Sequence, residues 1–121
     1  MLLDEPFSNL DAPQRDRMRR EVRRILTDAG ATALFVTHDQ EEALAIADTV
    51  AVMRDGAVVQ SGRPSDVYSR PVDPWTASFL GDSVFLEGTA SSGGTVATSL
   101  GTLPLSAGEP GPVRVMVRPE W

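Results

Sequence analysis

Two neighbouring carboxylates and a distant histidine are the residues of this chain best suited to chemistry. Asp4 and Glu5 follow two leucines, and His38 lies 33 positions after Glu5. An aspartate at the end of a buried strand can hold Mg²⁺ through its water shell, because this ion keeps several waters. Since side chains alternate along an extended chain, Glu5 is expected to point away from Asp4 and to orient a water for in-line attack. Taken alone, the pair also fits an exposed acidic turn, and a lone histidine also fits a structural role.

Composition limits the other function classes. The chain has 121 residues, with 17 acidic against 11 basic side chains and a formal net charge of −6. This length fits one ordinary domain or a modest domain with an appendage, and the acidic balance argues against sequence-independent nucleic-acid binding. The chain has no Cys, which rules out disulfides and thiolate metal sites, and every basic residue is Arg. We expect neither a membrane span nor an export signal, because no apolar run is long enough.

The elements that must position Asp4, Glu5 and His38 alternate between strand and helix. Residues 1–3 indicate the end of a buried strand whose beginning is missing, and 31–36 a second strand covered on both faces. Between them, Asp11 can cap a helix, with Gln14 at the reciprocal capping position and Gly30 at its end. The apolar face of this helix is expected to be Met18, Val22, Ile25, Leu26 and Ala29. Another helix is predicted after Asp39, where Glu41 and Glu42 suit the positive end of its dipole.

Turn residues divide the remainder of the chain. Asp55-Gly56 predicts a hairpin between 49–54 and 57–60, and two short helices are expected at about 65–69 and 74–80. After Gly81 helical periodicity disappears, and β-type runs are found at 84–86, 95–98 and 113–117. We therefore predict a module boundary near Gly81-Asp82, between an α/β part and an all-β part of 40 residues that is too small for a secure core.

Charge is concentrated in the first predicted helix. Residues 13–24 hold six arginines against two acidic residues, so the rest of the chain is strongly acidic. Such a run can contact an anionic surface, but its place on a periodic helix favours a solvated outer face.

The segment from Met1 to Asp11 resembles the Walker B motif and D-loop of ABC-transporter ATPases. Residues 36–43 resemble their H-loop at the spacing the family requires, and 48–56 and 62–64 match its continuation. The resemblance covers about residues 1–81, although Asn9 stands where the family commonly has Ala. It implies an α/β fold, the C-terminal part of a P-loop NTPase domain.

The resemblance also implies roles for individual residues. Asp4 corresponds to the Mg²⁺ residue, Glu5 to the catalytic carboxylate, and His38 to the histidine that contacts the γ-phosphate and helps to place the attacking water. Asp4, Glu5 and His38 together would bind ATP with Mg²⁺. The D-loop residues would touch a second ATPase subunit across a nucleotide sandwich; these are Ser8, Asn9, Leu10 and Asp11.

Residues 82–121 resemble the OB-like module appended to importer ATPases. The similarity rests on 80–86, 100–105 and an apolar strand followed by Arg118-Pro119-Glu120. The family's module is longer, so the chain is expected to stop partway through it. OB-like folds can bind nucleic acid, but few aromatics and only two cations, Arg114 and Arg118, favour regulation or subunit contact.

Several parts of the family's nucleotide site have no counterpart here. The P-loop with its lysine, the Gln-loop, the adenine-stacking aromatic and the signature motif are all missing from the sequence. Ser92-Gly93-Gly94 resembles a signature but lies downstream of Walker B, and we interpret it as a hairpin turn. Because phosphoryl transfer depends on positioning and charge stabilisation, we expect no appreciable ATP hydrolysis by this chain alone.

The resemblance implies a portion of the ATP-hydrolysing subunit of an importer, peripheral on the cytoplasmic face of the membrane. Its implied partners are transmembrane permease subunits and a second ATPase subunit. The C-terminal pattern is closest to the ferric-iron, polyamine, sulfate and sugar importers, with ferric iron slightly ahead. An exposed apolar sheet edge, left by an absent strand, predicts a dimer or larger assembly, with strand swapping as one form of it. The alternatives are a non-catalytic dimerisation or regulatory fragment, and a DNA-repair or chromosome-structure ATPase, which the importer-like tail disfavours.

Overall fold

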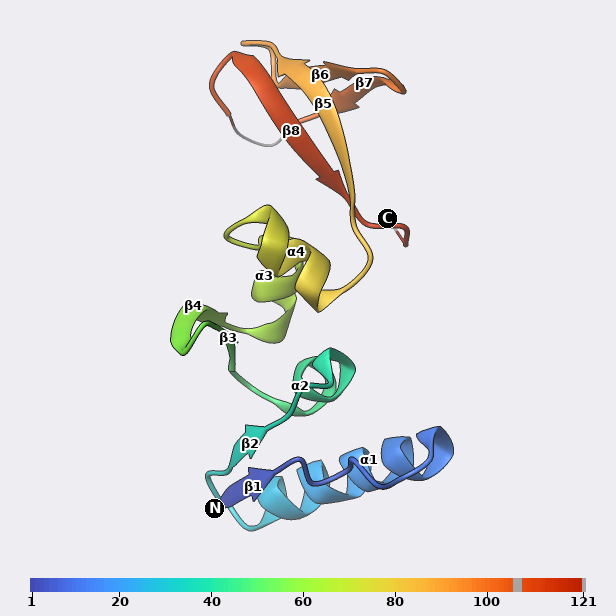
Figure 1. The fold of residues 1–121 in the computed structure, drawn as a ribbon, viewed down its shortest axis with the longest axis vertical. Helices are drawn as coiled ribbons and strands as arrows, with labels where there is room; N and C mark the ends of the chain where they lie inside the picture. Colours follow the sequence, from blue (N-terminus) through green and yellow to red (C-terminus); the bar gives the residue numbers. More distant parts are fainter. Residues whose placement is uncertain (106–107, 121) are drawn as a thin grey trace. The chain divides into compact units, whose positions relative to one another are not determined.

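The structure, a computed structural model, describes residues 1–105 and 108–120 (Figure 1). The chain divides into two compact units, Met1–Gly81 and Asp82–Trp121. The first unit mixes helices and strands, whereas the described residues of the second form strands and no helix. An α/β class for the first part is therefore confirmed at this coarse level.

A short parallel sheet holds the residues predicted to do chemistry. Strand β1 (Leu2–Asp4) pairs with β2 (Leu34–Val36) so that Leu2 lies opposite Leu34 and Asp4 opposite Val36. Helix α1 (Ala12–Asp28) forms the crossover between them. Its first turn is capped by Asp11, whose carboxylate accepts a hydrogen bond from the Gln14 amide at 2.9 Å. Gly30 follows the helix with φ of +60°, the left-handed conformation expected at that point.

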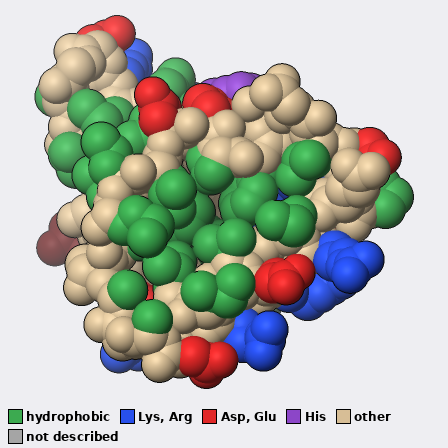
Figure 2. All heavy atoms as spheres, turned by 90° about the horizontal axis from the view of Figure 1, so that it is seen from below, with side chains coloured by type: hydrophobic (Ala, Val, Ile, Leu, Met, Phe, Trp, Pro, Cys, Tyr) green, Lys and Arg blue, Asp and Glu red, His purple; other side chains and the backbone are tan. Residues whose placement is uncertain are grey.

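The prediction that both strands are buried is wrong for this chain. Leu2, Leu34 and Val36 are 67%, 63% and 47% exposed. Parallel strands become buried when elements cover both faces of their sheet, and β1 and β2 form a sheet of only two strands among the described residues. The expected apolar face of α1 is likewise incompletely covered, because Met18 and Ile25 remain exposed. Hydrophobic side chains gather over a broad area of the surface seen in Figure 2.

The rest of the first unit packs around a hairpin. Helix α2 (Gln40–Ile46) leads to β3 (Val50–Arg54) and β4 (Ala57–Gly62), followed by α3 (Pro64–Ser69) and α4 (Pro74–Leu80). Asp55 and Gly56 both have positive φ, as a tight two-residue hairpin turn requires. The core of this region consists of Val50, Val52, Val67 and Leu80. The predicted hairpin and the three short helices are all present.

The second unit is an antiparallel sheet in the order β7-β6-β5-β8. Its strands are β5 (Val84–Ala90), β6 (Thr95–Thr98), β7 (Gly101–Pro104) and β8 (Gly111–Val117). Strand β7 was not predicted as a strand. Gly88 lets β6 approach closely, because a Cβ atom there would lie 2.7 Å from the Ala97 carbonyl oxygen. The assignment of this sheet to an OB-like module remains a prediction.

Within the described residues, none of the helices combines the length and apolar content needed to cross a bilayer.

Candidate active site

Asp4 and Glu5 lie where β1 ends. Asp4 is the last residue of the strand and its side chain is exposed. The Glu5 amide still donates to the Val36 carbonyl at 2.7 Å, but Glu5 itself has φ of +46°. The predicted strand alternation is therefore not what directs the Glu5 side chain. A left-handed bend, which is uncommon for a residue other than Gly, turns it instead.

The structure brings Glu5 and His38 into direct contact. Oε1 of Glu5 lies 2.6 Å from Nδ1 of His38 and accepts a second hydrogen bond from the His38 amide at 3.0 Å. Parallel pairing of β1 with β2 explains this contact, because it places the residues that follow both strands at the same end of the sheet. The His38 side chain is 82% exposed and that of Glu5 35% exposed. The pair can therefore be reached from solvent.

Each partner shifts the pKa of the other. The hydrogen bond from His38 lowers the pKa of Glu5, assisted by the charge of a protonated imidazole. The hydrogen bond to Glu5 raises the pKa of His38, and the charges of Glu5, Asp39 and Glu42 act in the same direction. The pair consequently favours a carboxylate beside an imidazolium.

Behind this pair lies a second carboxylate that sequence reasoning did not assign to the site. Glu42 is only 3% exposed, and its Oε2 accepts a hydrogen bond from the Thr37 hydroxyl at 2.9 Å. Nε of Arg15 lies 3.8 Å from Oε1 of Glu42, and Nη1 of Arg15 donates to Asp39 at 2.8 Å. The spacing of Asp39 and Glu42, three residues apart at a helix start, is a capping-box signal that could have drawn attention to Glu42. Its contact with Arg15, which is distant in sequence, could not be found in this way.

The four predicted interface residues form the turn between β1 and α1. The Ser8 hydroxyl donates to the Glu5 carbonyl at 3.0 Å, and the Leu10 carbonyl accepts from Arg15 at 3.2 Å. Ser8, Asn9 and Asp11 are exposed and Leu10 is half-buried. These residues are accessible to another molecule, while their contact with a second subunit stays a prediction.

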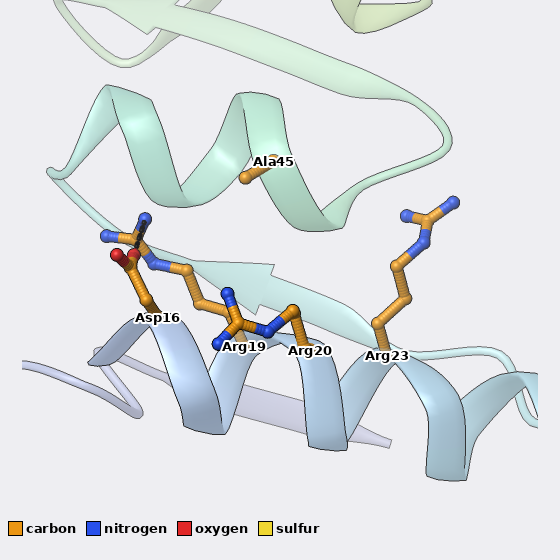
Figure 3. A pocket seen from close by; sticks show the side chains of 5 residues that line it. All are labelled: Asp16, Arg19, Arg20, Arg23 and Ala45. Atoms are coloured by element: carbon orange, nitrogen blue, oxygen red, sulfur yellow. Dashed lines mark hydrogen bonds and ion pairs between the residues drawn. The ribbon is translucent and has the colours of Figure 1, made fainter. Parts of the chain in front are cut away.

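The basic run on α1 is less solvated than predicted. Arg15 and Arg19 are half-buried beside α2, and both lie within ion-pair distance of Asp39. Arg19, Arg20 and Arg23 line a cavity of about 130 Å³. Arg23 extends from α1 towards α2 in Figure 3, whereas Arg20 lies along α1. Arg23 donates to the carbonyl of Ile46 and pairs with Asp48 at 3.0 Å. The arginines of this face therefore hold α1 and α2 together.

The donor set suits a magnesium ion only if other ligands complete its shell. No group of three His, Asp or Glu side chains that could hold a metal occurs in the described residues. Mg²⁺ often binds through one or two carboxylates, substrate phosphates and waters. The exposed carboxylate of Asp4 fits that mode and does not form a metal cage by itself.

A separate hollow of about 910 Å³ lies in the first unit. Thr37 and His38 line it together with apolar residues of β2, α2 and β3, whereas Asp4 and Glu5 do not. This hollow and the Asp4–Glu5 pair are thus different surfaces that meet at the segment after β2.

No family model matches the chain. Among curated proteins, an Fe(3+) ions import ATP-binding protein, FbpC, of Pseudomonas fluorescens is 49% identical over 99% of this chain, which corresponds to 34% of that protein. FbpC 1 of Rhodococcus jostii is 50% identical over 99% of the chain and 35% of its own length. The spermidine/putrescine import ATP-binding protein PotA of Ruegeria pomeroyi is 46% identical over the same shares.

The chain is homologous to part of the ATP-binding proteins of ABC importers. It spans about a third of the length of these relatives. The resemblance of residues 1–81 to ABC ATPases is thereby confirmed, and the similarity extends over nearly the whole chain. The names of these relatives specify the import of ferric iron or of spermidine and putrescine.

Proposed function

We propose that this chain is a portion of the ATP-hydrolysing subunit of an ABC importer, in which Glu5 and His38 are the catalytic pair. The contact of Glu5 with His38, 33 residues apart and 2.6 Å between side chains, is the observation that carries the proposal. Homology to import ATP-binding proteins over 99% of the chain supports it. ATP and Mg²⁺ are the expected substrate and cofactor.

The proposed mechanism assigns one task to each side chain. Asp4 would hold Mg²⁺, which supplies positive charge beside the phosphates of bound ATP. Glu5 would orient the attacking water and accept its proton, because a carboxylate with a lowered pKa remains ionised at neutral pH. The exposed imidazole of His38 would donate a hydrogen bond to the γ-phosphate while it stays oriented by Glu5.

The isolated chain is proposed to be inactive. No lysine-containing P-loop is present in its sequence, so nothing neutralises the β- and γ-phosphates. Purified chain with MgATP should release no phosphate above the blank. Turnover that Glu5→Gln abolishes would contradict this part of the proposal.

The function itself is tested on a longer protein, expressed from the same reading frame extended upstream. If the extension adds a P-loop and a signature motif, the longer protein should hydrolyse ATP. Glu5→Gln and His38→Ala should each lower kcat by about 100-fold or more, since the first removes a positioned general base and the second a hydrogen bond to the developing charge. Asp55→Asn, in the hairpin turn, is the matched control and should leave kcat unchanged. An extension without these motifs, or turnover insensitive to Glu5→Gln, would reject the assignment.

The partners follow from the same proposal. Ser8, Asn9, Leu10 and Asp11 would contact a second ATP-binding subunit, and permease subunits would hold the protein at the cytoplasmic face of the membrane. We propose ferric iron as the transported solute and polyamines as the alternative, because the names of the relatives specify these solutes. The four-stranded sheet of the second unit would be part of an OB-like regulatory module.

A second candidate function is supported by the uncovered sheet face. Exposed Leu2, Leu34 and Val36 lie on one side of β1 and β2, where apolar surface favours association. The chain could then act as a non-catalytic dimerisation or regulatory fragment, with strand exchange as one form of dimer. An upstream frame without a P-loop would favour this candidate.

A further inference from the structure

The Thr37 hydroxyl lies within hydrogen-bond distance of the carboxylates of Glu5 and Glu42, and it can donate only one hydrogen bond. Its oxygen lies 2.9 Å from Oε2 of Glu42, 3.4 Å from Oε2 of Glu5 and 3.0 Å from the Asp39 amide nitrogen. The Asp39 amide can only donate, so the hydroxyl accepts from it and keeps its own proton for a carboxylate. The shorter distance assigns that proton to Glu42.

Glu42 is suited to hold this proton because it has few other partners. The residue is 3% exposed, and its nearest cation, Nε of Arg15, lies at 3.8 Å. A buried carboxylate needs hydrogen bonds to offset its lost hydration. The Thr37 hydroxyl is therefore a partner that Glu42 does not readily release.

The two oxygens of Glu5 have different roles as a result. Oε1 is taken by the amide and the imidazole of His38. Oε2 has the distant Thr37 hydroxyl as its only hydrogen-bond partner among the described residues, at 3.4 Å. If Thr37 donated its hydrogen bond to Glu5 instead, Oε1 would have two partners and Oε2 one, so a single acceptor site of the carboxylate would remain for a water.

We propose that Glu42 is a positioning residue that acts through Thr37: by holding the hydroxyl proton, it leaves Oε2 of Glu5 open to a water molecule. This inference rests on the proposed function, in which Glu5 orients the attacking water. Neither Thr37 nor Glu42 touches the reacting atoms in this role.

The test uses His38, the only histidine of the chain, as its reporter. Its imidazole pKa is raised by the hydrogen bond to Glu5, so the midpoint of its NMR titration reports how strongly Glu5 binds it. Other charged groups that act on His38 are Asp39 and Glu42. Glu42→Gln removes the charge but keeps an oxygen for Thr37, whereas Glu42→Leu removes both.

We expect the His38 midpoint in Glu42→Leu to lie about 0.5 pH unit below that in Glu42→Gln, because the freed hydroxyl then donates to Glu5. In the Thr37→Val background the two Glu42 variants should have equal midpoints. Thr37→Ser, which keeps the hydroxyl, should preserve the difference. Equal midpoints with Thr37 present, or a difference that survives Thr37→Val, would overturn the proposal.

Thr37→Val alone provides an independent check in which Glu42 stays intact. If the hydroxyl proton is held by Glu42, this change should leave the His38 midpoint within about 0.2 pH unit of the parent chain. A clear rise would show that Thr37 already donates to Glu5, and would overturn the proposal. Amide spectra of each variant verify that α2 is formed. All these measurements use the chain without nucleotide, so a failure of ATP binding and a failure of this inference are distinguishable.

Discussion

The Glu5–His38 contact links stability to pH at the scale of single residues. Glu5 has its pKa lowered from 4.5 in the fold, so its contribution is present above pH 4.5 and is lost as pH falls through the lowered value. His38 has its pKa raised from 6.5, so its contribution is present below pH 6.5 and is lost as pH rises through the raised value. The pair stabilises most between these two ordinary values.

Glu5→Gln should therefore destabilise the chain most near pH 5.5. The loss relative to the parent should be smaller at pH 8.5, because the imidazole loses its charge as pH rises through the raised pKa of His38. Urea unfolding at the two pH values measures it. An equal loss of stability at both pH values would show that the charge of the Glu5–His38 pair does not stabilise the chain. Glu87→Gln, which removes the partner of Arg114, controls for general effects of a lost charge.

The positive φ of Glu5 leads to a second residue-scale prediction. Glycine tolerates the left-handed region, whereas alanine there costs about 1 kcal/mol more. Glu5→Gly should thus unfold at higher urea concentration than Glu5→Ala, the reverse of the order seen in regular strands. At Leu3, inside β1, the same pair of substitutions should give the ordinary order.

At the scale of elements, α2 depends on one aspartate with two tasks. Asp39 caps the helix by accepting from the Glu42 amide at 3.1 Å, and it pairs with Arg15 on α1 at 2.8 Å. Asp11 caps α1 in the same way, and within the described part of the chain its side chain makes no other hydrogen bond. The two caps form a matched comparison.

Asp39→Ala should cost more stability than Asp11→Ala. A lost cap costs about 1 kcal/mol in either helix, and Asp39→Ala also removes the partner that holds α1 to α2. Asp39→Asn keeps a capping oxygen and should fall between the parent and Asp39→Ala. Urea titrations give the free energy of unfolding of all three variants. Equal losses in Asp39→Ala and Asp11→Ala would contradict a stabilising role of the Asp39–Arg15 ion pair.

Local elements could be predicted from the sequence, whereas burial could not. The Asp55-Gly56 turn and the Asp11 cap depend on neighbouring residues, and both are found as predicted. The helix expected after Asp39 is also present. The apolar runs that contain Leu2 and Leu34 are typical of strands buried on both faces, and burial was therefore predicted. A strand is buried only where other elements cover its sheet, and the described residues do not supply them. The proximity of Glu5 and His38 was expected from the family resemblance. The burial of Glu42 beside Arg15 was not predicted, because local sequence patterns do not reveal a contact between residues 27 positions apart.

At the scale of the whole molecule, uncovered apolar surface predicts association. Leu34 is 63% exposed on a sheet of two strands, and Leu100, in the second unit, is 77% exposed in a short turn. An apolar sheet with an unpaired edge and an uncovered face associates with other chains more readily than a single exposed side chain does.

The chain should therefore form dimers or larger species at micromolar concentration. Leu34→Lys should shift the population towards monomer, because a charge on the sheet face opposes burial, while Leu100→Lys should not. Multi-angle light scattering measures the mass of each. A monomeric parent chain would contradict the prediction.

The parallel pairing of β1 with β2 also sets the order in which the site can assemble. Glu5 leaves the ribosome 33 residues before His38, and the intervening chain must close a long loop before the two side chains meet. Helix α1 occupies most of that loop, so its early formation shortens the search for the second strand. During synthesis, Glu5 therefore remains without its histidine until α1 has emerged and β2 has followed it.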